Sequence, residues 1–347
     1  MLVVMKHAAT KEQIDGVVRA IEALGYRARP MPGAQRTTVG LVGNDGRVDE
    51  GHLSGLTGVL RIIHVSPPYK QVSREWSPED TVIELDNGVL IGGSDVVVMA
   101  GPCAVESRDQ ILTTARRVAA AGATVLRGGA FKPRTSPYSF QGLGEEGLEL
   151  LADARAETGL AIITEALDPA GVELVAKYAD IIQIGARNMQ NYSLLRAAGR
   201  AGKPVMLKRG MAATVKEWLL AAEYIVVEGE PRVMLCERGV RNFDSHARNL
   251  FDLTAVVTIK ELSHLPVIAD PSHGTGARSK VGPMTRASVA AGADGVIVEV
   301  HPDPATAVSD GAQSLFPEQF DDLMVELRTI AAALDRDVAR LPALAAG

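Results

Sequence analysis

Cysteine and aromatic residues are scarce in this chain of 347 residues, which contains 2 Cys, 2 Trp and 6 Phe. Two cysteines, Cys103 and Cys236, cannot build a disulfide framework and fit a reducing compartment, so we expect a cytoplasmic protein. With 4% aromatic residues, no segment offers a stacking platform for nucleic-acid bases. An excess of basic residues is also missing. The 36 Lys and Arg against 42 Asp and Glu give a net charge of −6, which argues against a nucleic-acid partner.

Long apolar runs are missing as well. The first residues, MLVVMKHAATKEQ, turn polar too early for the apolar core of a signal peptide. No uninterrupted apolar run approaches the roughly 18 residues of a membrane span. We therefore expect no insertion into a membrane and no anchoring on one. With 46% apolar and 22% charged residues, and 34 Gly at no fixed period, the composition is that of an ordinary globular protein.

The first 66 residues show the pattern of a small α+β module. Apolar residues recur at helical spacing between Thr10 and Leu24, and a second, short helix is predicted at Glu50–Leu56. Strands are predicted at Leu2–Lys6, Tyr26–Met31, Thr37–Val42 and Leu60–Val65. The resulting β-α-β-β-α-β order is typical of a ferredoxin-like domain, which we place at residues 1–66. Residues 67–94 are predicted to be a linker and a β-hairpin, because Asn87-Gly88 lies between two apolar runs.

From residue 95 onward, short apolar runs alternate with helical patterns eight times. The predicted strands are Val96–Ala100, Thr124–Arg127, Ala161–Glu165, Ile181–Gly185, Pro204–Lys208, Arg232–Cys236, Pro266–Asp270 and Gly295–Glu299. Eight strand–helix units in about 250 residues predict a (β/α)8 TIM barrel over residues 95–340. A doubly wound open sheet is the alternative, but no Gly-x-Gly-x-x-Gly follows the first strand. In such barrels the active site lies at the carboxyl ends of the strands.

Polar side chains mark the carboxyl ends of these strands. They are Cys103, Arg127, Glu165, Gln183 with Arg187, Lys208, Glu237 with Arg238, Asp270 with His273, and Glu299. Six cations belong to this set or its loops: Arg127, Lys132, Arg134, Arg187, Lys208 and Arg238. Mixed Arg and Lys at a barrel mouth are typical of sites for phosphorylated substrates. Each cation alone could be solvated or could pair with a nearby acid, such as Glu237 beside Arg238, but six together make this improbable.

A second group at the strand ends offers one sulfur, one imidazole and two carboxylates. Its members are Cys103, His273, Glu299 and Asp310. Mixed ligands of this type suit Mn2+, Fe2+, Co2+ or Zn2+. Their spacing is dispersed, so two alternatives stay open: Cys103 as a small buried apolar residue and His273 as part of a glycine-rich loop.

Several segments can be read together: MAGPCAVES, LRGGAFKPRTSPYSFQGLG, ITEALDP, IGARNMQN, LKRG, DPSHGTG and VEVHPDPATAVSDGAQSL. They closely resemble 3-deoxy-D-arabino-heptulosonate 7-phosphate (DAHP) synthase of type I-beta, over about Tyr69 to Leu315. The run Lys132-Pro133-Arg134-Thr135-Ser136 is similar to the erythrose 4-phosphate signature of that family. The sister octulosonate 8-phosphate synthases carry Lys-Ala-Asn-Arg-Ser there.

The resemblance implies a metal-dependent condensation of phosphoenolpyruvate with erythrose 4-phosphate, the first step of the shikimate pathway to the aromatic amino acids. It implies metal ligands at Cys103, His273, Glu299 and Asp310. It implies a phosphoenolpyruvate site at Arg127, Lys132, Arg187, Lys208 and Arg238, to which we add Gln183, and an aldose phosphate site at Arg134, Thr135 and Ser136. The catalytic residues would be Lys132, Glu165 and His273, with Lys132 as proton donor and Glu165 orienting water. Feedback inhibition by tyrosine or phenylalanine at residues 1–66, and a homotetramer, are also implied.

Other functions compete with this one. The nearest are an octulosonate 8-phosphate synthase and a sialic-acid-type synthase, against which the KPRTS run argues. A Schiff-base aldolase using Lys208 is a second enzymatic alternative. In a non-enzymatic alternative the barrel is a scaffold and the small module a ligand sensor. The module itself could instead be a stabilising or oligomer-forming appendage.

Overall fold

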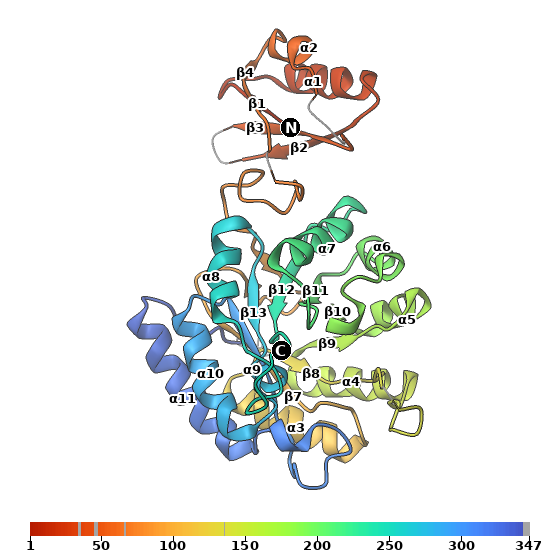
Figure 1. Cartoon of the computed structure of the whole chain (residues 1–347), viewed down its shortest axis with the longest axis vertical. Coiled ribbons are helices and arrows are strands. Elements are labelled where there is room, and N and C mark those ends of the chain that lie inside the picture. The colour runs from red at the N-terminus through yellow and green to blue at the C-terminus, as the bar shows by residue number, and fades with distance from the viewer. Residues whose placement is uncertain (34–35, 45–47, 66, 135, 343–347) are drawn as a thin grey trace, which may run out of the picture. The chain divides into compact units, whose positions relative to one another are not determined.

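The computed structural model describes residues 1–33, 36–44, 48–65, 67–134 and 136–342. It divides into two compact units, Met1–Pro78 and Glu79–Gly347, and most of their elements are labelled in Figure 1. Within the described ranges, no helix combines the length and the apolar character needed to cross a membrane.

The first unit is an antiparallel sheet of four strands with two helices. Its elements are β1 (Leu2–Met5), α1 (Lys11–Ala23), β2 (Arg27–Pro32), β3 (Thr37–Val42), α2 (Gly51–Ser54) and β4 (Val59–Ile63), and the strand order is β2-β3-β1-β4. Helix α1 begins at a capping box formed by Thr10 and Gln13. Its apolar face packs through Val17 and Ile21 on the sheet residues Val3 and Leu41. This arrangement confirms the predicted ferredoxin-like fold.

The stretch from residue 67 to Pro78, expected to belong to the linker, is part of this first unit. Val72 and Trp76 are buried. The indole of Trp76 lies against Gly40 of β3, where a Cβ atom would come within 2.1 Å of the ring. Polar residues alternate with these buried ones in the sequence, which is why the composition alone resembles that of a linker.

A small hairpin precedes the barrel and closes its amino-terminal end. Its strands are β5 (Ile83–Glu84) and β6 (Leu90–Ile91). Ile83 and Ile91 share one apolar cluster with residues at the beginnings of the barrel strands, among them Val97 and Ala161. The amide of Asn87 in the turn donates hydrogen bonds to two backbone carbonyls of the barrel unit. The hairpin therefore fills the bottom of the barrel interior.

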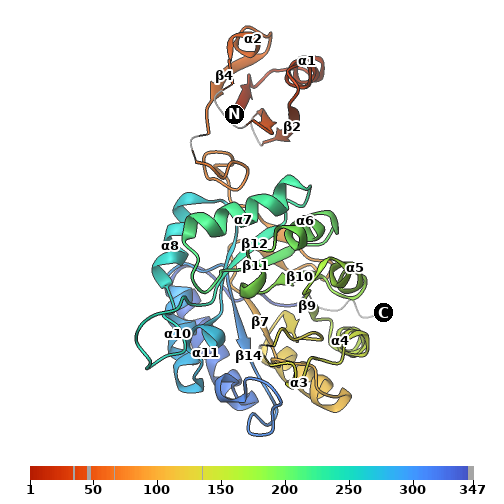
Figure 2. The same cartoon turned by 45° about the vertical axis from the view of Figure 1, so that its right-hand side comes forward.

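Eight parallel strands form the closed barrel. They are β7 (Val97–Gly101), β8 (Val125–Arg127), β9 (Ala161–Glu165), β10 (Ile181–Ile184), β11 (Val205–Lys208), β12 (Val233–Glu237), β13 (Val267–Ala269) and β14 (Gly295–Glu299). Figure 2 shows the helices around them. These helices are α3 (Arg108–Ala121), α4 (Glu145–Thr158), α5 (Pro169–Tyr178), α6 (Tyr192–Arg200), α7 (Val215–Val227), α8 (Leu253–Leu262), α10 (Arg278–Ala290) and α11 (Pro317–Ala333). The predicted TIM barrel is confirmed.

The barrel interior changes from apolar to polar or charged along most of the strands. Met206 and Ile297 belong to the apolar cluster at the bottom, and two residues further along their strands lie Lys208 and Glu299. Because side chains two apart point to the same side of a strand, these charged groups occupy the upper layer of the same interior. The pattern repeats on other strands, in the pairs Val125 and Arg127, Ile163 and Glu165, Ile181 and Gln183, and Ile268 and Asp270.

Candidate active site

A cavity of about 330 Å³ opens at the carboxyl ends of the barrel strands. All six cations predicted from the sequence line it, together with Arg248, Glu165, Gln183, His273, Asp310 and Ser136. Thr135 lies outside the described residues. The cavity wall thus carries seven cationic side chains, a composition that fits an anionic ligand with more than one charged group.

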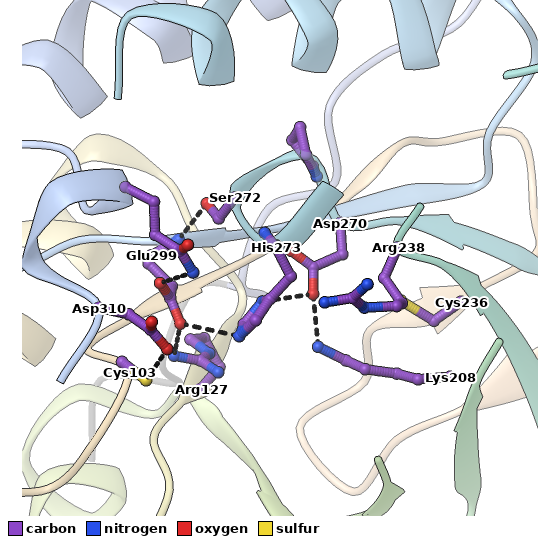
Figure 3. A network of polar contacts seen from close by, with 12 residues as sticks. Cys103, Arg127, Lys208, Cys236, Arg238, Asp270, Ser272, His273, Glu299 and Asp310 are labelled. Carbon is purple, nitrogen blue, oxygen red and sulfur yellow. Dashed lines mark hydrogen bonds and ion pairs between the residues drawn. The ribbon is translucent and has the colours of Figure 1, made fainter. Parts of the chain in front are cut away.

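The four predicted metal ligands come together beside this cavity (Figure 3). Cys103 follows β7, His273 lies on the short helix α9 (Pro271–Thr275), Glu299 ends β14, and Asp310 precedes the 3-10 helix η2 (Gly311–Gln313). One ligand atom from each lies within 4.8 Å of the other three. Sulfur, imidazole nitrogen and carboxylate oxygens at such separations fit a divalent transition-metal ion.

The thiol of Cys103 is neutral in the absence of an ion. Burial, followed by the charge of Glu299, raises the pKa of Cys103 to about 11, although Lys132 acts in the opposite direction. The Nζ atom of Lys132 lies 3.0 Å from Sγ of Cys103, and Oδ2 of Asp310 lies 3.1 Å from the same sulfur. A metal ion binds the thiolate form, so an ion that binds here must displace a proton.

Asp310 is held in an unusual backbone conformation, with a φ of 53°. Two side chains, one of helix α10 and one of the loop itself, fix this loop. Arg278 donates a hydrogen bond of 2.9 Å to the carbonyl of Gly311, and Oγ of Ser314 donates one of 3.1 Å to the carbonyl of Asp310. Burial alone would raise the pKa of Asp310, but His273, Cys103 and Arg248 outweigh it and lower the pKa to about 2. This carboxylate is therefore ionised near neutral pH.

Arg127 connects the cavity to the metal-ligand group. Its Nη1 atom lies 3.1 Å from Oε1 of Glu299 and donates to the carbonyl of Pro102 at 2.6 Å. Its Nε atom is buried and has no hydrogen-bond partner among the described residues. A buried donor without a partner is costly, and Arg127 as a residue also lines the cavity.

Asp270 lies between Lys208 and His273. Its Oδ2 atom is 2.5 Å from Nζ of Lys208 and 2.8 Å from Nδ1 of His273. Burial would raise the pKa of Asp270, but the charges of His273 and Lys208 outweigh it and hold the pKa well below its usual range. Asp270 is thus a buried, ionised carboxylate behind the cavity wall.

The carboxylate of Glu165 has room only because its neighbour Gly185 has no side chain. A Cβ atom on Gly185 would lie 2.0 Å from Oε1 of Glu165, so the carboxylate occupies space that only glycine leaves free. Gln183 donates a hydrogen bond of 3.4 Å to Oε2 of Glu165. The result is a buried carboxylate that lines the cavity and has capacity to accept further hydrogen bonds.

Glu237 does not pair with Arg238, so that alternative is wrong. Glu237 follows the inward-pointing Cys236 and points to the outer side of the barrel, where its Oε2 atom lies 2.9 Å from Nη1 of Arg209. Arg238 points inward and donates a hydrogen bond of 3.2 Å to the carbonyl of Gly239. Arg238 therefore remains available to the cavity.

Arg248 and Gln313 are functional candidates that the sequence analysis missed. Nη1 of Arg248 lies 3.4 Å from Oδ1 of Asp310 and 3.1 Å from Oε1 of Gln313. Nε2 of Gln313 donates a hydrogen bond of 2.7 Å to Oε2 of Glu299. Arg248 lies in the loop between β12 and α8. A search of the whole loops, in addition to the strand ends, would have included it, since loops supply the sites of such barrels.

Two family profiles match the chain. The profile of the DAHP synthetase I family matches residues 80–333, and that of the DAHP synthase ferredoxin-like domain matches residues 1–67. Together they cover both compact units of the structure.

Similar proteins and structures agree with these profiles. Phospho-2-dehydro-3-deoxyheptonate aldolase of Thermotoga maritima is 49% identical over 334 residues, which are 96% of this chain and 98% of the relative. A crystal structure of that DAHP synthase from Thermotoga maritima is similar with a TM-score of 0.78 and 48% identity, covering 97% of this chain and 99% of the other. A 2-dehydro-3-deoxyphosphooctonate aldolase of Syntrophotalea carbinolica is 35% identical over 261 residues, 70% of this chain and 93% of the relative.

Proton release on metal binding tests the ligand group. At pH 8 the Cys103 thiol, with its pKa of about 11, is protonated, so binding of Mn2+ should release about one proton from it, and affinity should rise about tenfold per pH unit between pH 7 and 9. Calorimetry in buffers of different ionisation enthalpy measures the release. Cys103→Ser should lose this slope, whereas Cys236→Ala, which alters the apolar layer below, should keep it. A slope unchanged in Cys103→Ser would contradict ligation by this sulfur.

Proposed function

The chain belongs to the DAHP synthetase I family, and we propose that it condenses phosphoenolpyruvate with D-erythrose 4-phosphate to 3-deoxy-D-arabino-heptulosonate 7-phosphate and inorganic phosphate. It is a transferase of the DAHP synthase type, the first enzyme of the shikimate pathway. The observation that carries the substrate assignment is the cavity at the barrel mouth, in which seven cations adjoin the metal-ligand group.

The positive wall of the cavity suits two phosphorylated substrates. Phosphoenolpyruvate would bind at Arg127, Lys132, Gln183, Arg187, Lys208 and Arg238, which all line the cavity. Arg134 and Ser136 line the same cavity and would hold the phosphate of the aldose. The side chain of Arg134 is oriented by a hydrogen bond of 3.1 Å from Nε to the carbonyl of Phe140. Such fixed guanidinium groups recognise phosphate without much further loss of conformational freedom.

A divalent ion would be held by Cys103, His273, Glu299 and Asp310. When bound, it would act as a Lewis acid on the aldehyde oxygen of the aldose. The chain's contribution is to present thiolate, imidazole and two carboxylates in one place. The donor set fits Mn2+, Fe2+, Co2+ or Zn2+ alike.

The reaction requires one proton to be given and one water to be oriented. C3 of phosphoenolpyruvate bonds to the aldehyde carbon, water adds at C2, and phosphate leaves as the bond between C2 and its oxygen breaks. Lys132 lies beside the ligand group, with Nζ 2.9 Å from the carbonyl of Cys103, and is placed to protonate the aldehyde oxygen. Glu165 lines the cavity as a buried carboxylate and is placed to orient the water and, as a base, to take up the proton that the water loses on adding to C2. Cations around the phosphate stabilise the leaving group.

The geometry argues against a Schiff-base aldolase. Burial would lower the pKa of Lys208, but the carboxylate of Asp270 outweighs it and raises the pKa above its usual value. A lysine that stays protonated is a poor nucleophile. Lys208 is therefore better suited to bind an anion than to attack a carbonyl.

The first unit is proposed to be a regulatory domain that binds tyrosine or phenylalanine. Support comes from its match to the DAHP synthase ferredoxin-like domain and from its compactness as a separate unit.

The proposal also includes a cytoplasmic location and a homotetrameric assembly. The free thiols of Cys103 and Cys236 suit a reducing compartment.

A substrate comparison tests the proposed reaction. With phosphoenolpyruvate and Mn2+, release of inorganic phosphate should be at least about tenfold faster with erythrose 4-phosphate than with arabinose 5-phosphate. A chelator should abolish release and added Mn2+ should restore it. Faster release with arabinose 5-phosphate would instead identify an octulosonate 8-phosphate synthase. Full activity in chelator would refute the metal dependence.

Replacement of Lys132 tests the proton donor. Lys132→Met should lower kcat by about 10²- to 10⁴-fold, the usual contribution of a general acid, while calorimetry still detects binding of phosphoenolpyruvate to the remaining cations of its site. Lys216→Met, which removes an exposed lysine on α7, should leave kcat unchanged. If Lys132→Met keeps native turnover, the proposed role is wrong.

Deletion of residues 1–78 tests the regulatory domain. Because the two units are separately compact, the remaining barrel should keep its turnover but lose inhibition by tyrosine or phenylalanine. Initial rates with and without each amino acid, before and after deletion, provide the measurement. Inhibition that survives the deletion would rule out the sensor. A full-length chain that neither amino acid inhibits would favour a stabilising appendage.

A further inference from the structure

The carboxylate of Asp270 is shared between the anion cavity and the metal-ligand group. Its Oδ2 atom contacts both Nζ of Lys208, at 2.5 Å, and Nδ1 of His273, at 2.8 Å (Figure 3). Its Oδ1 atom accepts a hydrogen bond of 3.0 Å from the backbone N–H of His273. A single oxygen atom thus lies against a cation that lines the cavity and an imidazole that belongs to the ligand group.

We propose that Asp270 is a positioning residue that couples the binding of a phosphorylated anion at Lys208 to the binding of a divalent ion at His273. The inference rests on the proposed function, because it takes Lys208 and His273 in the roles given there. It adds a thermodynamic link between the two sites, in which each ligand increases the affinity for the other.

The geometry explains the direction of the coupling. Nδ1 of His273 is buried and has no hydrogen-bond partner among the described residues, despite its short distance to Asp270. In this state the nearest donor to Oδ2 is the ammonium group of Lys208. A phosphate in the cavity attracts that ammonium group, which releases the carboxylate of Asp270 to turn toward His273 and accept a hydrogen bond from Nδ1–H.

A hydrogen bond from Nδ1–H to a carboxylate strengthens a histidine as a metal ligand. The bond fixes the tautomer and the orientation of the ring and raises the basicity of Nε2. The Nε2 atom of His273 faces the ligand group, since it lies 3.3 Å from Oε1 of Glu299. Because Asp270 is 1% exposed, little solvent screens the exchange of its partners.

Two other routes could connect the sites. Arg127 lines the cavity and contacts Glu299, and an anion and a metal ion also attract each other directly. Neither route needs Asp270. Substitution of Asp270 therefore separates the proposed coupling from both of them.

The experiment measures Mn2+ affinity of the full-length chain by electron paramagnetic resonance, with and without inorganic phosphate. In the native chain, phosphate should lower the Kd for Mn2+ by about five- to tenfold, within the usual range of coupling between sites. Asp270→Asn should bind Mn2+ more weakly, and phosphate should change its Kd less than about twofold. Lys208→Gln should bind Mn2+ at least as tightly as the native chain without phosphate, and should not respond to phosphate.

The opposite signs of the two variants distinguish coupling from loss of structure, which would weaken Mn2+ binding in both. Asp294→Asn is the matched control. Asp294 is also buried, and it accepts hydrogen bonds from Lys260 at 3.0 Å and from the backbone of Val267 at 2.7 Å, at the amino-terminal end of the barrel. This variant should show the native response to phosphate.

Each of the following results would overturn the coupling. A native chain that binds Mn2+ without any response to phosphate overturns it and leaves the proposed function intact. An Asp270→Asn variant with the native response overturns it in favour of Arg127 or direct attraction. A native chain that binds no Mn2+ overturns both the coupling and the proposed metal site. If Asp270→Asn does not fold, weaker Mn2+ binding in Lys208→Gln is sufficient to reject the proposal.

Discussion

Burial of charge at the carboxyl end of the barrel is the constraint on which the rest of the site depends. Arg127, Lys208 and Glu299 are each less than 5% exposed, and a buried charge without a partner costs about 3–5 kcal/mol. Each therefore lies against an opposite charge, Arg127 against Glu299 and Lys208 against Asp270. Glu299 is itself a candidate metal ligand, and Asp270 contacts another, His273. The ion pairs that offset the cost of burying these cations thus also hold the metal-ligand group in place.

Neighbouring residues on the outer side of the barrel hold this layer in position. Lys208 and Arg209 are consecutive and point to opposite sides of the barrel, as do Glu237 and Arg238. Outside the barrel, Arg209 contacts both Glu237 and Asp252 at 2.9 Å. This outer network joins the ends of β11 and β12 and so fixes the backbone from which Lys208 and Arg238 enter the cavity. The buried charges inside the barrel are available to bind a ligand, and those outside it hold the strand ends in position.

The periodic parts of the molecule could be predicted from the sequence, because a period reports which face of an element is buried. The barrel, and the strand ends that carry Arg127, Lys208 and Glu299, could be predicted because apolar runs and helical patterns alternate eight times. The packing of residues 67–78 on the first sheet could not be predicted from the sequence. It depends on the fit between Trp76 and Gly40, which are far apart in the chain. Arg248 could be included only by a search of every loop at the barrel mouth, and its contact with Asp310 could not be predicted. Its place beside Asp310 results from two long loops that meet, and no local pattern encodes that meeting.

The arrangement of charged side chains around the cavity, more than the net charge of the chain, determines which ligand the barrel can bind. The chain carries a net charge of −6, yet seven cations line the cavity. The acids that neutralise the deepest of these, Glu299 and Asp270, do not line the cavity and lie behind its wall. Cationic groups therefore face the ligand while the buried layer stays close to neutral. A local field of this kind attracts anions whatever the overall charge, and the same buried layer presents Glu299 to the metal-ligand group.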